Sequence, residues 1–183
     1  MIAAVEAVKA RLLRATSLLE AAEIPYAVIG GNAVAAWVAR IDIAAVRNTQ
    51  DVDLLIRRDD FGRVRDTLEE GGFVYRQVFG VDCFLESEDA NPRDAVHIVF
   101  ANEKVKPADL AATADVNEVE RADDYWILQL ESLVKMKLTS YRDKDRTHLR
   151  DMIEIELIDA TWPSRYPAEL AQRLQALLDD PNG

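Results

Sequence analysis

The chain has 183 residues, of which 49% are apolar and 30% are charged, and its formal net charge is −11. This length and composition indicate a globular protein with a substantial core. The acidic balance argues against extended duplex DNA as a partner, because an acidic surface repels phosphate backbones. The single cysteine, Cys83, excludes an internal disulfide and a cysteine-rich zinc site.

Several features of the sequence predict a cytoplasmic protein without a membrane partner. A single cysteine suits a reducing compartment. The N-terminal residues do not form the basic and apolar regions of a signal peptide. The longest apolar stretch, residues 24–39, contains Pro25, Gly30, Gly31 and Asn32, and it is too short and too broken to cross a bilayer.

The first half of the chain is predicted to alternate helices and strands. Apolar spacing, capping residues and glycine pairs mark the boundaries of these elements. In chain order we expect a helix over 2–22, a strand over 26–29, a helix capped by Asn32 and running to about Arg40, a loop over 41–50, a strand over 51–56, and a helix capped by Asp59 or Asp60, running to Glu70 and ended by Gly71 and Gly72.

The second half is predicted to add strands and then become helical. Short apolar runs between turn residues predict strands, and helical periodicity follows residue 128. We expect strands over 73–79, 83–86 and 95–100 and helices over 130–141, 145–157 and 167–178. The expected fold class is α/β (α+β), with residues 1–125 as the sheet-containing core and residues 126–183 as a helical part packed on it in one compact unit.

Residues 30–53 carry the most informative pattern in the chain. Gly30 and Gly31 follow an apolar run, and they allow a tight turn that brings the backbone close to a ligand. Asp51 and Asp53 alternate with apolar residues, so on a strand both carboxylates would project from one face, about 7 Å apart. Such a pair can hold Mg²⁺, which takes carboxylate and phosphate oxygens. The alternative for an isolated pair is two surface aspartates on an edge strand, but the glycines and the apolar neighbours favour a metal–nucleotide site.

The order of strand, Gly-Gly-Asn-Ala, helix and then Arg-Asn-Thr-Gln-Asp-Val-Asp over residues 47–53 resembles the nucleotidyltransferase superfamily, whose fold is shared with DNA polymerase β. Over about residues 24–151 the chain is most similar to small bacterial members grouped with AbiEii-type toxins and stand-alone nucleotidyltransferases. By analogy, a toxin-like or modifying enzyme of a bacterial two-gene (toxin–antitoxin) module would fit. The resemblance implies a mixed sheet flanked by helices, with a hydroxyl attacking the α-phosphate of a nucleoside triphosphate such as ATP.

The same resemblance implies roles for particular residues. Gly30 and Gly31 would touch phosphate, while Asp51 and Asp53 would bind Mg²⁺ or Mn²⁺. Backbone N–H groups at the start of the helix that contains Asn32 would add a positive field. Two residues of the following loop, Arg47 and Thr49, are also assigned to the nucleotide, although Arg47 could equally be free in solvent.

His97 stands where the family usually has a third acid, on the strand over residues 95–101. Asp94 lies three residues earlier and on the opposite strand face, so it is a poor substitute. His97 could ligate the metal as a neutral imidazole, act as a base, or hydrogen-bond the nucleophile. The alternative is a structural histidine bonded to a backbone carbonyl.

A basic segment over residues 135–150 forms the second constellation. Its Lys-Met-Lys-Leu, Arg-Asp-Lys-Asp and later Asp resemble a family pattern in which a lysine faces the phosphates and a Lys-Asp pair anchors the helical part to the sheet. The resemblance implies that Lys137 neutralises triphosphate charge, with Lys144 and Arg142 next. The alternative is a solvated helix face with ion pairs one turn apart, and His148 is expected on that surface.

The sequence therefore predicts a metal-dependent enzyme that moves a nucleoside monophosphate from a nucleoside triphosphate to an unidentified hydroxyl-bearing acceptor. This acceptor could be a tRNA, a protein or a small molecule. Asp51, Asp53, His97 and Lys137 are the predicted catalytic residues, and the first three are the predicted metal ligands. One alternative is a nucleotide-binding or interaction domain of the same fold that has lost catalysis. Another is a structural helper that binds no nucleotide, and each alternative is compatible with a partner protein.

Overall fold

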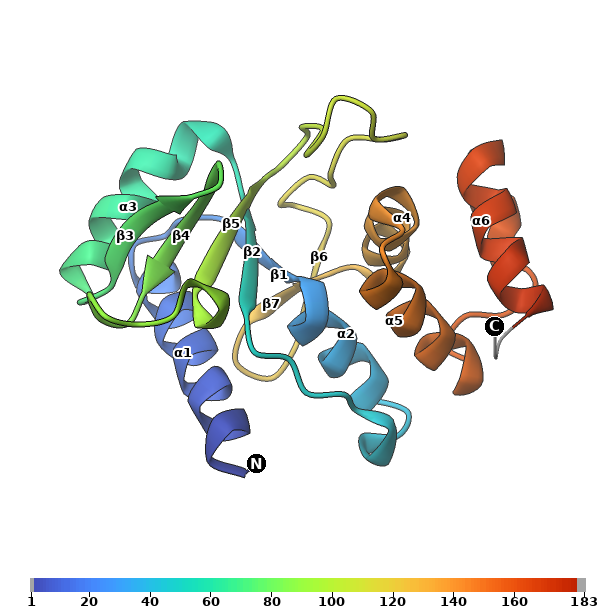
Figure 1. The fold of residues 1–183 in the computed structure, drawn as a ribbon, viewed down its shortest axis with the longest axis horizontal. Helices are drawn as coiled ribbons and strands as arrows, with labels where there is room; N and C mark the ends of the chain where they lie inside the picture. Colours follow the sequence, from blue (N-terminus) through green and yellow to red (C-terminus); the bar gives the residue numbers. More distant parts are fainter. Residues whose placement is uncertain (1, 181–183) are drawn as a thin grey trace.

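The computed structural model describes residues 2–180, which form a seven-stranded mixed sheet with helices against it (Figure 1). The order of the strands across the sheet is β3-β4-β5-β2-β1-β7-β6. The strands are β1 (Tyr26–Ile29), β2 (Val52–Ile56), β3 (Val74–Val78), β4 (Val81–Leu85), β5 (Val96–Phe100), β6 (Val119–Arg121) and β7 (Trp126–Leu128). The helices are α1 (Ile2–Ala21), α2 (Gly30–Ala39), α3 (Phe61–Glu70), α4 (Leu130–Ser140), α5 (Asp143–Glu154) and α6 (Ala168–Asp179).

Two groups of helices pack against the strands. Helices α1 and α3 contact each other, and α1 also contacts β2 and β5. Helix α2 continues directly from β1 and contacts β2, α4 and α5, while α6 packs on α4 and α5 (Figure 1). None of the helices within residues 2–180 combines the length and apolarity that a membrane crossing requires. The predicted α/β class is confirmed.

The centre of the sheet is almost entirely apolar, and this makes one polar residue conspicuous. All four residues of β1 are buried, and in β2 every residue except Asp53 is fully buried. Strand β2 pairs antiparallel with β1, where Asp53 lies opposite Ile29, and parallel with β5, where Asp53 lies opposite His97. A carboxylate in the middle of a buried strand costs solvation free energy unless something compensates its charge. The fold therefore directs attention to the neighbourhood of Asp53.

Most of the predicted elements are present, with boundaries shifted by a few residues. The glycine pair at residues 71–72 ends α3 as expected, with Gly72 at a φ of +85°. The expected carboxylate caps of α3 are wrong, because α3 begins at Phe61 and Asp60 makes no capping hydrogen bond. Helix α5 begins two residues earlier than predicted, because Asp145 accepts a hydrogen bond from the backbone N–H of Arg142 and so caps the first turn.

The predicted cap of α2 is also wrong. The helix begins at Gly30 rather than after Asn32, and no side chain caps it. The amide Nδ2 of Asn32 instead donates to the backbone oxygen of Asp51 at 2.8 Å. Asn32 therefore fixes the entry to β2, and the backbone N–H groups at the start of α2 remain without a side-chain cap.

Two strands were absent from the sequence-based expectation. Strand β7 pairs parallel with β1, and β6 pairs antiparallel with β7, so both belong to the same sheet. Each has three residues, which is too short for an alternation of apolar and polar residues to indicate a strand. Residues 126–128, the first of the expected helical part, thus lie in the sheet beside β1 and lead directly into α4.

Candidate functional site

Three potential metal ligands meet beside the start of α2. Asp53 comes from β2, His97 lies next to it on β5, and Asp51 stands just before β2. One ligand atom of each of these three side chains lies within 4.8 Å of the others. The three residues are called the Asp–Asp–His cluster below. The sequence predicted that these three side chains share one site, and in the structure they lie close together.

The glycine turn makes direct room for this cluster. A Cβ atom added to Gly30 would lie 1.9 Å from Oδ2 of Asp53, and the φ of Gly30 is +65°, a region that L side chains rarely adopt. A Cβ atom on Gly31 would lie 2.8 Å from Cβ and Oγ1 of Thr49. Close packing against the site therefore requires a glycine at both positions, and the positive φ adds a second requirement at Gly30.

Replacing Gly30 with alanine is expected to disturb the cluster more than the fold. The new methyl group would displace the Asp53 carboxylate, so we expect Mn²⁺ binding, measured by electron paramagnetic resonance, to weaken by at least about tenfold. Gly80→Ala is the matched control, because Gly80 has a φ of +80° but nothing within 4 Å of the added Cβ. Equal Mn²⁺ binding by the two variants would contradict the interpretation of Gly30.

Asp51 is held as an ionised carboxylate by its neighbours. The hydroxyl of Thr49 donates to Oδ1 at 2.5 Å, and Nζ of Lys144 lies 3.3 Å from the same oxygen and 3.4 Å from Oδ2. Burial acts to raise the pKa of Asp51, but the Thr49 hydrogen bond and the Lys144 charge outweigh it and hold the pKa below its usual range. The carboxylate is thus prepared to accept a cation.

His97 is oriented by a backbone carbonyl. Its Nε2 lies 2.9 Å from the oxygen of Pro92, which can only accept, so Nε2 carries the hydrogen. Nδ1 then faces Oδ1 of Asp53 at 3.6 Å. The adjacent carboxylate of Asp53 raises the pKa of His97, burial opposes this, and the Pro92 carbonyl adds to the rise. His97 therefore has the carbonyl bond expected of a structural histidine, and it also aims a ring nitrogen into the cluster.

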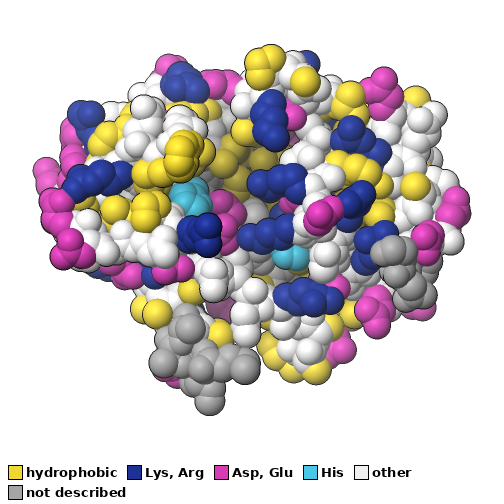
Figure 2. All heavy atoms as spheres, viewed as in Figure 1, with side chains coloured by type: hydrophobic (Ala, Val, Ile, Leu, Met, Phe, Trp, Pro, Cys, Tyr) yellow, Lys and Arg dark blue, Asp and Glu magenta, His cyan; other side chains and the backbone are white. Residues whose placement is uncertain are grey.

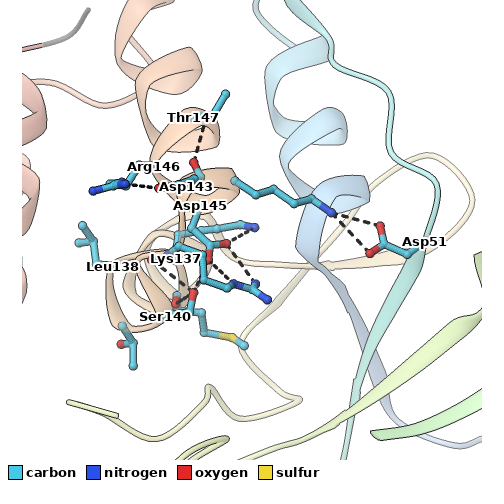
Figure 3. Close-up of polar contacts among 12 residues, drawn as sticks. Asp51, Lys137, Leu138, Ser140, Asp143, Asp145, Arg146 and Thr147 are labelled. Atoms are coloured by element: carbon cyan, nitrogen blue, oxygen red, sulfur yellow. Dashed lines mark hydrogen bonds and ion pairs between the residues drawn. The ribbon is translucent and has the colours of Figure 1, made fainter. Parts of the chain in front are cut away.

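Lys137 lies in the wall of the cavity, and its charge is already paired within the protein. Its Nζ is buried and lies 2.9 Å from Oδ1 of Asp145, and Asp145 also accepts from Ser140 at 2.7 Å and from Nε of Arg142 at 2.8 Å. Figure 3 shows Asp145 pointing toward Lys137 and Ser140, on the helical side of the site. Burial would raise the pKa of Asp145, but the bonds from Arg142 and the charge of Lys137 hold it well below its usual range. Lys137 lines the cavity but is committed to joining α4 to α5.

Two other basic residues of the segment, Lys144 and Arg142, line the cavity beside the cluster. Lys144 reaches from α5 to Asp51, as the dashed lines to Asp51 in Figure 3 show. The side chains of Lys144 and Arg142 are 50% and 66% exposed, in contrast to 6% for Lys137. The bond to Asp145 raises the pKa of Arg142, and the charges of Asp53 and Asp51 act in the same direction. Lys144 and Arg142 thus supply accessible positive charge on the helical side of the cluster.

Arg47 has a different place from the one expected. Its Nε and a terminal nitrogen contact the two carboxylate oxygens of Asp151 at 2.5 and 3.0 Å. Arg47 lines neither of the two cavities that border the cluster. Its guanidinium ties the loop after α2 to α5.

Two cavities border the cluster. One, of about 700 Å³, lies between the sheet face and the α4–α5 helices, and the other, of about 760 Å³, lies beside α1. Figure 2 shows the hollow between strands and helices with a hydrophobic floor and with Lys and Arg side chains gathered along its helical side. The residues that line both cavities are Asp51, Arg93, His97 and Lys144. The cluster can therefore be approached from two directions.

Two residues of this region were missed or misplaced by sequence reasoning. Arg93 lines both cavities from the turn before β5, and its position depends on a long-range strand pairing that no local pattern reveals. His148, expected on the helix surface, is buried. Its Nδ1 has no hydrogen-bond partner within residues 2–180, and burial together with Lys137 and Lys144 lowers its pKa to about 4. A neutral, buried His148 is consistent with a role in core packing.

Comparisons with known proteins place this chain in a family. The family profile described as "Uncharacterised nucleotidyltransferase" matches residues 3–181. A search of curated proteins found no match. Since the profile's description names no subtype, the AbiEii-type grouping stays a prediction.

Solved structures share the fold at low sequence identity. A nucleotidyltransferase-like antigenic protein from Paracoccidioides brasiliensis has a TM-score of 0.62 at 18% identity, over 97% of this chain and 90% of that chain. The antibiotic-resistance factor ANT(2'')-Ia gives a TM-score of 0.53 at 14% identity, over 91% of this chain and 88% of that chain. Its complex with adenylyl-2''-tobramycin gives 0.50 at 15% identity, over 84% and 95% of the two chains. These likenesses support the fold.

Proposed function

We propose, because the chain belongs to this nucleotidyltransferase family, that it transfers a nucleoside monophosphate from a nucleoside triphosphate to a hydroxyl-bearing acceptor. The observation that supports the proposal most is the convergence of Asp51, Asp53 and His97 within 4.8 Å beside the glycine turn at the start of α2. A cytoplasmic location, the AbiEii-type grouping and the division into residues 1–125 and 126–183 belong to the same proposal and rest on the sequence pattern.

The helical side of the cavity suits the triphosphate. Helix α2 begins at Gly30 without a side-chain cap, and both Gly30 and Gly31 line the cavity, so free backbone N–H groups and the positive end of the helix dipole are available to phosphate. Lys144 and Arg142 add two full charges on α5. The exposed contact between Lys144 and Asp51 is weak enough to be exchanged for a phosphate oxygen. These groups would bind and orient the nucleotide and neutralise charge on the transferring phosphate.

The donor set of the cluster fits a divalent cation. Two carboxylates and one imidazole nitrogen converge, and His97 donates its other ring N–H to the Pro92 carbonyl, as metal-binding histidines commonly do. Asp51, Asp53 and His97 would hold Mg²⁺ or Mn²⁺. When bound, such an ion supplies Lewis-acid stabilisation of the phosphoryl oxygens and of the attacking hydroxyl.

The test of the proposed function is transfer of label from nucleotide to acceptor. The protein is incubated with each α-³²P-labelled nucleoside triphosphate and Mg²⁺ or Mn²⁺, with and without cell lysate. Label that moves to a larger or chemically altered product in the presence of the unmodified protein supports the proposal. The size of the labelled product also separates a tRNA or protein acceptor from a small molecule.

Replacing His97 with aspartate is expected to shift metal preference toward Mg²⁺. A third carboxylate suits this hard ion better than an imidazole does. We expect the ratio of Mg²⁺ to Mn²⁺ dissociation constants to fall by about tenfold, measured by displacement of Mn²⁺ in electron paramagnetic resonance. Asn91→Asp is the control, because it adds the same charge at an exposed position of the preceding turn. A ratio that falls equally in both variants would show a general charge effect instead of a role for His97.

The second candidate is a nucleotide-binding domain without catalysis. The presence of His97 in place of a third acid favours it, because its ring nitrogen lies 3.6 Å from Asp53 and its raised pKa would oppose cation binding. Metal-dependent nucleotide binding without label transfer under every condition would support this candidate over the enzyme.

A further inference from the structure

Phe79, at the tip of the β3–β4 hairpin, does not contribute to the packing of the fold. Val78 pairs with Val81, so Phe79 and Gly80 form a two-residue turn, with φ values of +50° and +80°. Turns of this kind favour Asn-Gly, because both positions have positive φ. Phe79 adopts this conformation against the preference of a bulky residue, and its side chain is fully exposed. The positive φ and the exposed ring both destabilise the folded chain, and no packing of Phe79 within the chain offsets this cost.

This exposed ring belongs to the cavity that contains the Asp–Asp–His cluster. The apolar wall of the cavity, as the term is used below, consists of Val78, Phe79, Val81, Val99 and Val105. Val105 stands across from the hairpin on the loop after β5 and is 66% exposed, and Val81 is 45% exposed. Figure 2 shows hydrophobic side chains on the floor of the hollow and at its edge. Unpaired apolar surface beside a polar cluster is typical of a ligand pocket.

The helical side of the cluster carries positive charge, whereas the side formed by β4, β5 and the hairpin is apolar. This difference indicates which of the two substrates the apolar wall binds. Backbone N–H groups of α2 and the charges of Arg142 and Lys144 lie on the helical side, where the triphosphate is proposed to bind. The attacking and leaving oxygens of a nucleotidyl transfer lie roughly in line. The acceptor must then arrive from the opposite side, where His97 on β5 is followed across the sheet by β4 and the hairpin.

We propose that the apolar wall binds the acceptor and that the acceptor carries a flat apolar or aromatic group next to its hydroxyl. The inference rests on the proposed nucleotidyl transfer. The acceptor oxygen would bond to the α-phosphorus, the bond from that phosphorus to the bridging oxygen would break, pyrophosphate would leave with its electron pair, and the hydroxyl proton would pass to solvent. A polycationic amino sugar would find few partners here: of the acids that line the cavity outside the cluster, Asp109 already accepts a backbone N–H of Lys106 at 2.8 Å, and Asp145 is buried in its ion pairs.

The test is binding of 1-anilinonaphthalene-8-sulfonate to the folded protein, followed by fluorescence. Phe79→Asn removes the ring and supplies the residue that the turn prefers. We expect this variant to bind the probe about tenfold more weakly, as loss of one aromatic stacking partner predicts, and to melt about 2–4 °C higher because the turn strain is relieved. The control is Ile43→Asn, since Ile43 is 76% exposed but lines neither cavity found within residues 2–180.

Two further measurements separate the possible occupants of the wall. Saturating Mg²⁺–ATP should leave the probe bound, and tobramycin, as a polycationic amino sugar, should not displace it. Probe binding that is absent, or equal in the Phe79 variant and the unmodified protein, overturns the proposal. Displacement by Mg²⁺–ATP assigns the wall to the nucleobase, and displacement by tobramycin assigns it to an amino sugar, so either result overturns it too. Failure to bind any nucleotide contradicts the proposed function and leaves the dependence of probe binding on Phe79 as a separate result.

Discussion

Replacing Asp53 with asparagine is expected to reduce nucleotidyl transfer by at least about a hundred- to a thousandfold. Asp53 is the one carboxylate that lies on β2 itself, between the glycine turn and His97. Asparagine keeps the shape of the side chain, so the close approach to Gly30 survives while one negative charge is lost. The expected loss is therefore one of cation and nucleotide binding, because a neutral amide is a poorer ligand for a hard divalent ion.

The measurement combines label transfer with Mn²⁺ binding and a thermal melt. Asp59→Asn serves as the control, because it makes the same chemical change on an exposed residue in the turn that follows β2. A melting temperature close to that of the unmodified protein would show that the fold is intact. If the Asp53 variant kept transfer and Mn²⁺ binding at the level of the Asp59 variant, the Asp–Asp–His cluster would not be the site.

The parts of the site that could be predicted from sequence are those fixed by short-range geometry. Asp53 lies on β2 opposite Ile29, and the turn at Gly30 directly follows β1. The alternation of side chains along a strand and the need for a glycine at a positive φ are local properties. His97 could be placed because β5 keeps the same alternation. What could not be read locally is which element contacts which, so Arg93 and the short strands β6 and β7 became visible only with the full sheet.

The burial of Lys137, in contrast to the exposure of Lys144, has a physical cause that is partly present in the sequence. In α4, Leu133, Val134 and Leu138 form the buried face, and Lys137 lies one turn after Leu133 on that face. A lysine on an apolar face is buried only when it is paired, and Asp145 supplies the partner. Helical phase therefore indicated burial, whereas the family resemblance favoured a cation in the cavity. In the structure Lys137 is buried in its ion pair and also lines the cavity.

The buried pair itself leads to a second large effect. Asp145→Asn is expected to lower the free energy of unfolding by about 3 kcal/mol, because it leaves the buried ammonium of Lys137 without a counter-charge. For a chain of this size the melting temperature would fall by about 6–12 °C. The matched control is Asp143→Asn on the same helical turn, where the side chain is 92% exposed and pairs with Arg146 at the surface. We expect that control to cost less than about 1 kcal/mol.

The pH dependence of unfolding provides an independent check of this pair. Because the pKa of Asp145 is lowered in the folded state, its contribution is complete above the ordinary value of 3.8 and is lost as the pH falls through the lowered folded-state pKa. The difference in stability between the unmodified protein and Asp145→Asn should therefore shrink on acidification below about pH 4. The double variant Lys137→Met/Asp145→Asn should recover part of the loss, since no unpaired charge remains buried. A double variant no more stable than Asp145→Asn would instead attribute the loss to the cap that Asp145 provides for α5.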